Sequence, residues 1–163
     1  MESSTLTTSR AAVLHLKKIL VPVDFSEPSE QALTYALRFA TEFGAELTLL
    51  YVLEESGVGA YAEVALNRED SDEKLSTARA SLHALESLVK GSSSLKIRSR
   101  IRRGLAAHQI VEAAKEFDTD LIVIATHGYT GWKHFCIGST TESVVRTAPC
   151  PVFVVREKEH DFI

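Results

Sequence analysis

A glycine-bearing segment, Gly128-Tyr-Thr-Gly131-Trp-Lys-His-Phe-Cys-Ile-Gly138-Ser139, has the composition of a phosphate-binding loop. Glycine lets the backbone approach phosphate oxygens without a Cβ in the way. The segment leads into a helical pattern, and the free N–H groups and dipole of a helix N-terminus favour an anion. Ser139 and Thr140 add hydroxyl groups at that helix start. The segment is not a Walker A loop, because no Gly-Lys-Ser/Thr follows its first glycine at the required distance.

Short apolar runs predict the strands that position this segment. Four runs do not alternate with polar residues, which is typical of parallel strands covered on both faces; they span 19–23, 47–52, 121–125 and 152–155. A fifth run, 96–101, alternates, so we expect it nearer an edge of the sheet. Pro22 has no N–H for a ladder, and the first strand should therefore end or bulge there.

Helical patterns fill the intervals between the strands. The first helix is expected to begin at a Ser26 cap, with Pro28 in its first turn, and to end at Gly44. A second is expected over 71–90 and a third after Gly104, and we interpret 55–69 as a loop. The fourth should start at Ser139, where Ser139-Thr-Thr-Glu142 has the pattern of a capping box.

This alternation predicts a single α/β domain, a doubly wound five-stranded parallel sheet with helices on both faces. By analogy with common folds of this type, we expect the strand order 3-2-1-4-5. That order leaves a crevice between the carboxyl ends of the first and fourth strands, where open α/β sheets bind ligands. Pro22-Val23-Asp24 and Ala125-Thr126-His127-Gly128 should meet there, although about a hundred residues separate them in the chain.

Composition argues against several classes of protein. The chain has 163 residues, 45% of them hydrophobic and 25% charged, which suits one globular domain. Its net charge of −4 argues against a nucleic-acid partner, because such proteins usually carry a basic patch. No run approaches the roughly eighteen apolar residues of a membrane span, and two cysteines make no disulfide framework. We expect a cytoplasmic domain over 16–157, with tails over 1–15 and 158–163.

These residues resemble the universal stress protein family over about 17–155. The opening, Lys17-Lys-Ile-Leu-Val-Pro-Val-Asp-Phe-Ser26, is similar to that family's first strand and turn, and 138–152 is similar to its end. The motif of the family's ATP-binding branch, Gly-x2-Gly-x9-Gly-Ser/Thr, reads here as Ala125-x2-Gly128-x9-Gly138-Ser139. An alanine thus replaces the first glycine. Its methyl group is tolerated if the backbone is extended, and is tolerated poorly if φ must be positive.

The resemblance implies a fold of the adenine nucleotide alpha hydrolase type that holds ATP or a related adenine nucleotide, with Mg²⁺ bridging the phosphates. Asp24 matches an aspartate that lies at the ribose, and Val52 matches a residue that lines the adenine pocket. A homodimer paired through 152–155 is also implied. The candidate nucleotide-binding residues are Pro22, Val23, Asp24, Val52, Ala125, Thr126, His127, Gly128, Gly131, Gly138, Ser139, Thr140 and Thr141.

Each candidate also has a purely structural interpretation. Asp24 is a common turn residue, Ser139 is a good helix cap, and Gly128 and Gly131 are frequent in turns. No histidine has a partner at His-x3-His spacing, so the sequence gives no reason to expect a protein-bound metal or a catalytic histidine.

Three functions stay open at this stage. The first is a nucleotide-binding stress-response or signalling module with, at most, slow ATP hydrolysis. The second is an interaction module of the same fold that binds no nucleotide, which Ala125 favours. The third is an enzyme of a related fold, such as an adenylyl transferase, although the Ser-Gly-Gly-x-Asp-Ser and His-x-Gly-His signatures of such enzymes do not occur.

Overall fold

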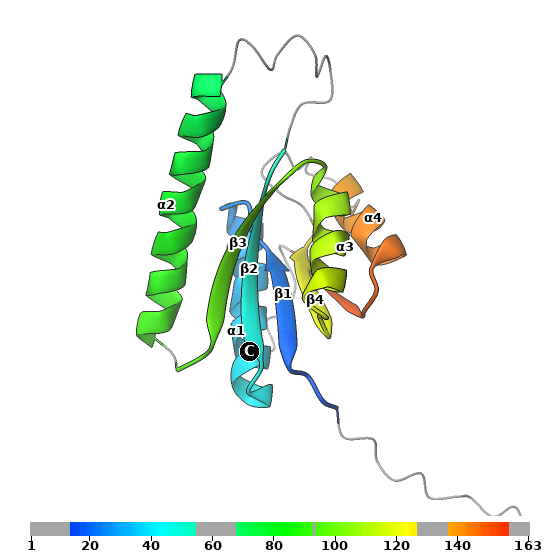
Figure 1. Ribbon diagram of the computed structural model, residues 1–163. Coiled ribbons are helices and arrows are strands. Elements are labelled where there is room, and N and C mark those ends of the chain that lie inside the picture. Colours follow the sequence, from blue (N-terminus) through cyan, green and yellow to red (C-terminus); the bar gives the residue numbers. More distant parts are fainter. Residues whose placement is uncertain (1–13, 55–67, 93, 127–136, 157–163) are drawn as a thin grey trace, which may run out of the picture.

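The computed structural model describes residues 14–54, 68–92, 94–126 and 137–156, which form alternating strands and helices (Figure 1). The strands are β1 (Lys18–Pro22), β2 (Glu46–Leu53), β3 (Ile97–Arg103), β4 (Leu121–Ala125) and β5 (Val152–Val155). The helices are α1 (Glu27–Phe43), α2 (Arg68–Ser92), α3 (Ala106–Glu116) and α4 (Ser139–Thr147). None of these helices is both long enough and apolar enough to span a lipid bilayer.

The strands form one parallel sheet in the order β3-β2-β1-β4-β5, which confirms the predicted order and the edge position of β3. The chain winds outward from β1 to β3 and then returns to place β4 on the other side of β1. Registered pairs join β1 to β2 as far as Pro22–Leu50, but join β1 to β4 at Ile19–Leu121 and Leu20–Ile122. The registered pairing of β1 with β4 therefore stops short of the carboxyl ends of both strands.

Each face of the sheet has its own buried apolar cluster, which explains why the strands read as unbroken apolar runs. The cluster on the α1 and α2 face contains Ile19, Val21, Leu47, Leu49, Val123, Ala36 and Leu82. The cluster on the α3 and α4 face contains Leu20, Leu50, Ile122, Ile124, Ile110, Ala114 and Val144. In Figure 1, α3 and α4 lie on one side of the sheet, and α2 runs alongside β3.

The helix ends follow the predicted signals in α1 but not in α4. Ser26 caps α1 by accepting the N–H of Ser29, and Gly44 closes the helix with φ +65°. The prediction of a capping box at Ser139 is wrong, because Gly138 is the cap residue and no side chain caps α4. Glu142 instead pairs with Arg146 one turn later, at 2.6 Å. α2 is also longer than the predicted 71–90.

Candidate functional site

The turn after β1 supplies the first half of the candidate site. Pro22 closes the strand, and the Val23 N–H donates to the carbonyl of Leu50 at 2.9 Å. The Val23 side chain is buried in the cluster beside α1, so contact with a ligand would fall to its backbone. Asp24 follows at the rim of the sheet and is partly buried.

Asp24 organises its own turn. Its Oδ1 accepts the Ser26 N–H at 3.1 Å and the Ser26 hydroxyl at 2.5 Å, and its N–H donates to the Ser29 hydroxyl at 3.4 Å. This is the Asx-type turn that aspartate favours before a helix. Asp24 therefore does act as a turn residue, and the turn fixes its carboxylate at the carboxyl end of β1.

The sequence pattern gives no sign of a special role for Phe25, which lies inside this turn. Its φ is +63°, a left-handed conformation that is uncommon for a bulky residue. Its ring stacks on Tyr51 of β2, with centroids 5.1 Å apart and planes at 26°. Nothing in the residue type predicts this backbone, because phenylalanine has no local hydrogen bond with which to stabilise it.

The second half of the site lies at the end of β4. Ala125 is the last residue of that strand, and its methyl group packs in the buried cluster beside α1. Its backbone is thus extended, the condition under which alanine fits at this motif position. Its carbonyl accepts the Thr141 hydroxyl at 2.7 Å, so that hydroxyl ties α4 to β4.

Thr126 joins the glycine segment to the sheet. Its N–H donates to the carbonyl of Val155 at 2.9 Å, and its carbonyl accepts the N–H of Gly138 at 2.8 Å. Thr126 and Gly138, twelve residues apart in the chain, are therefore joined beside the end of β4. Gly138 has φ −59° and ψ 150°, which any residue can adopt.

The structure thus brings together most of the candidate residues that it describes. The residues at the end of β1 lie beside those at the end of β4, because the two strands are neighbours in the sheet, and hydrogen bonds join the end of β4 to the start of α4. The residues concerned are Pro22, Val23 and Asp24 at the end of β1, Ala125 and Thr126 at the end of β4, and Gly138, Ser139, Thr140 and Thr141 at the start of α4. Val52 lies near the end of β2 and packs with the cluster under α3 and α4. His127, Gly128 and Gly131 lie outside the described residues.

The start of α4 suits an oxyanion. Its first N–H groups have no intrahelical partner to their N-terminal side, and the first bond within this turn runs from Glu142 N–H to the Gly138 carbonyl. Ser139 is exposed there and Thr140 is half-buried. Among the residues with assigned positions, no three His, Cys, Asp or Glu side chains are grouped to hold a metal ion.

Comparison with known proteins places this geometry in a family. The model of the universal stress protein family matches residues 15–156. A universal stress protein of Methanocaldococcus jannaschii is 35% identical over 149 residues, covering 89% of this chain and 85% of that protein. The solved structure of the universal stress protein UspA from Lactobacillus plantarum has a TM-score of 0.81 at 33% identity, covering 88% of this chain and 99% of that one.

A third solved structure, the universal stress protein from Archaeoglobus fulgidus in complex with dAMP, shares the fold, with a TM-score of 0.64 at 22% identity. The match covers 86% of this chain and 98% of the Archaeoglobus fulgidus chain. The sheet order, the turn after β1 and the start of α4 all lie within the matched range. Because the family model covers most of its length, the chain belongs to the universal stress protein family.

Proposed function

We propose that this protein binds ATP or another adenine nucleotide at the carboxyl ends of β1 and β4, and that it acts as a cytoplasmic stress-response or signalling module. The observation that supports this most directly is the bond from Gly138 N–H to the Thr126 carbonyl at 2.8 Å. It holds the start of α4 against the end of β4, at the point where the strand order reverses and where folds of this type bind ligands.

The proposal assigns each group a part. Asp24 lies at the ribose and Val52 lines the adenine pocket. Gly128, Gly138 and Ser139 approach the phosphates, with Thr140 beside them, and Mg²⁺ is held by the phosphates themselves. The extended backbone of Ala125 supports the assignment, since its methyl group occupies the core. The dAMP complex of the Archaeoglobus fulgidus protein supports only the general point that this fold accommodates an adenine nucleotide.

Isothermal titration of the full chain with ATP, AMP and cyclic AMP tests the proposal. We expect saturable binding, and we expect Gly138→Val to weaken it by at least about tenfold, because a branched side chain blocks approach of a phosphate to the backbone. The dihedral angles of Gly138 allow valine without strain, so this variant should fold. Gly91→Val is the control, since a Cβ at that helix position meets no atom within 4 Å. Absence of binding by all three nucleotides at millimolar concentration would reject the proposal.

One set of observations favours the second candidate, an interaction module of the same fold without nucleotide. The side chains of Asp24 and Thr141 both form hydrogen bonds within the protein. In addition, Ala125 departs from the glycine motif. Nucleotide that stays with the protein through purification would decide against this candidate, and it is seen as raised absorbance at 260 nm. Protein that carries no nucleotide and binds none in the titration would decide for it.

A further inference from the structure

A hollow of about 280 Å³ lies at the amino end of the sheet, on the face covered by α3. The first residues of β1 and β2, Lys18 and Glu46, line it together with Arg98 and Arg100 of β3. The candidate nucleotide site is at the opposite, carboxyl end of the same strands. A strand advances about 3.3 Å per residue, so Lys18 and Pro22 at the two ends of β1 are roughly 13 Å apart. We call this hollow the β3 groove.

The arginines reach the β3 groove because β3 alternates. Arg98, Arg100 and Arg102 are two residues apart, so all three side chains project from the same face of the strand. The outer two are matched by carboxylates: Arg98 forms an ion pair with Glu46, and Arg102 forms one with Glu116. Arg102 also lies over the ring of Phe117, 5.4 Å from its centroid.

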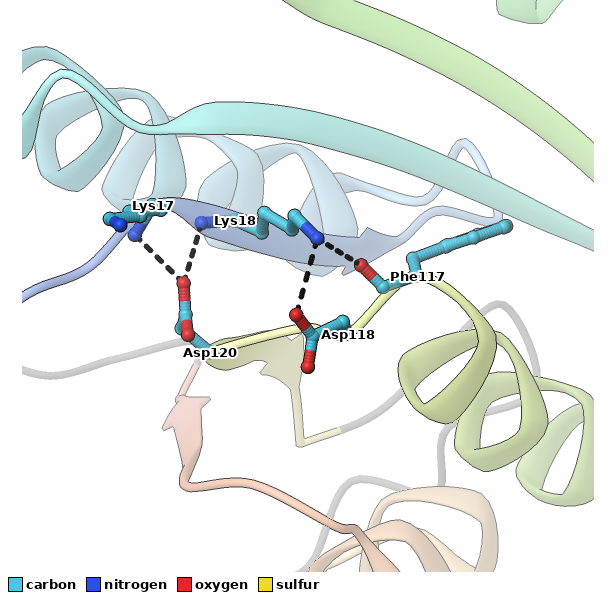
Figure 2. Close-up of polar contacts among 5 residues, drawn as sticks. All are labelled: Lys17, Lys18, Phe117, Asp118 and Asp120. Atoms are coloured by element: carbon cyan, nitrogen blue, oxygen red, sulfur yellow. Dashed lines mark hydrogen bonds and ion pairs between the residues drawn. The ribbon is translucent and has the colours of Figure 1, made fainter.

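Lys18 is occupied in a different way. Its Nζ donates to the carbonyl of Phe117 at 3.0 Å and lies 3.4 Å from Asp118 Oδ2 (Figure 2). Phe117 follows the last residue of α3, where the helix dipole presents partial negative charge. The ammonium group therefore offsets the negative end of α3 beside the β3 groove, and so reduces its repulsion of an anion.

Arg100 differs from Arg98 and Arg102 in the group to which it donates. Its Nη1 donates to the carbonyl of Ser99 at 2.8 Å, and within the described ranges the structure gives it no carboxylate. A guanidinium carries five N–H donors in a planar fork that fits a carboxylate or phosphate. Two threonines, Thr48 and Thr119, line the same hollow and bring hydroxyl groups. The lining holds three cations and two carboxylates, and both carboxylates are already paired.

We propose that the β3 groove binds a small oxyanion, the carboxylate or phosphate group of a small molecule, on the guanidinium of Arg100. The simpler explanation is that charged side chains on an edge strand prevent pairing with other chains. That explanation accounts for arginines at an edge, but it requires neither a hollow between strand and helix nor hydroxyl groups beside the unmatched cation. The groove is separate from the proposed nucleotide site, and the two can fail independently.

Amide NMR spectra of the full ¹⁵N-labelled chain test this inference. Inorganic phosphate and succinate are titrated separately, with sodium chloride at matched ionic strength as the reference. We expect saturable shifts at the amides of 98–100 and Thr119, and at least about a tenfold loss of affinity in Arg100→Gln, since an ionic hydrogen-bonding partner is removed. Arg38→Gln removes the same charge from an exposed position on α1 and should bind as the unaltered chain does.

The outcomes separate the alternatives. A response to phosphate alone or to succinate alone supports the inference and names the group that is recognised. Equal shifts with sodium chloride, or equal affinity in Arg100→Gln, would overturn it. Shifts caused by poly-glutamate but by neither small anion would also overturn it, in favour of an acidic protein segment. Gly138→Val should keep the response of the β3 groove, so a failure of nucleotide binding would not be mistaken for a failure here.

Discussion

At the scale of single residues, Phe25 shows how the site turn is built against local preference. Its left-handed backbone turns the chain directly after Asp24, and its ring is held against Tyr51. A left-handed conformation costs a residue with a Cβ about 1–2 kcal/mol, and strain of this kind often gathers at functional sites. Packing of the ring offsets the cost, so the turn depends on contacts that form only in the folded chain.

Two substitutions separate strain from packing at Phe25. Both Phe25→Ala and Phe25→Gly lose the ring, but only glycine also loses the cost of positive φ. We expect Phe25→Gly to be more stable than Phe25→Ala by up to about 1 kcal/mol, with both less stable than the unaltered chain. Urea denaturation measures the free energies of unfolding. An alanine variant as stable as the glycine variant, or more stable, would show that the backbone strain does not exceed the unfolded-state entropy that glycine adds.

Asp120 makes a second residue-scale contact, at the other end of the sheet. Its Oδ2 accepts the N–H groups of Lys17 and Lys18, at 2.8 and 2.9 Å, and so joins the starts of β1 and β4 (Figure 2). We expect Asp120→Asn to lower the free energy of unfolding by about 1 kcal/mol, because an ionised acceptor makes the stronger hydrogen bonds.

Asp118→Asn is the matched control for Asp120→Asn in the same denaturation experiment. The Asp118 side chain is 94% exposed, and its pair with Lys18 is 3.4 Å long. Such exposed pairs contribute little, and asparagine tolerates the left-handed backbone of this position. Equal destabilisation by the two substitutions would contradict the structural role given to Asp120.

At the scale of elements, one carboxylate of α2 adds a polar contact between this helix and the edge strand β3. Glu86 accepts a hydrogen bond from Lys90 Nζ at 2.5 Å and another from the hydroxyl of Ser99 on β3. The Lys90 hydrogen bond, followed by that of Ser99, holds the pKa of Glu86 below its ordinary value of 4.5. Ionised Glu86 is therefore the form that the folded state favours.

The stabilisation by Glu86 should depend on pH in a definite direction. A carboxyl whose pKa is lowered by folding stabilises the protein above its unfolded pKa, and this contribution is lost as the pH falls through the folded value. The difference in free energy of unfolding between the unaltered chain and Glu86→Gln should be largest near pH 7 and should shrink below pH 4.5. Glu73→Gln, at an exposed position of α2, is the control. A difference independent of pH would contradict the assignment.

Much of the element pattern was predictable because local signals agreed with the fold. Unbroken apolar runs predicted the central strands, and Ser26 and Gly44 predicted the limits of α1. The cap of α4 was not predictable, because Gly138 is placed by a bond to Thr126, twelve residues earlier in the chain. The ion pair between Arg98 and Glu46 leaves Arg100 without a carboxylate partner among the described residues. That pair likewise depends on the register of β2 against β3, which the sequence pattern does not specify.

At the scale of the whole molecule, β5 forms the second edge of the sheet, and its side chains 152–154 are only partly buried. An apolar edge strand is a template for pairing with another chain. We therefore expect a homodimer joined through β5.

Sedimentation equilibrium should then give twice the chain mass of 17.9 kDa. Val152→Asp should shift the protein to a single chain, because a charge would be buried at the interface. Leu88→Asp, at an exposed position of α2, should leave the mass unchanged. A monomer in the unaltered protein would contradict the expected homodimer.

The hydrogen bonds of Thr126 have a mechanical consequence. Two neighbouring peptide planes that share one Cα grip the outer strand on one side and the helix start on the other. A ligand that moves Gly138 would therefore act on the residue that also holds the carboxyl end of β5. The crevice and the border of the sheet thus share a single amino acid as their hydrogen-bonding partner.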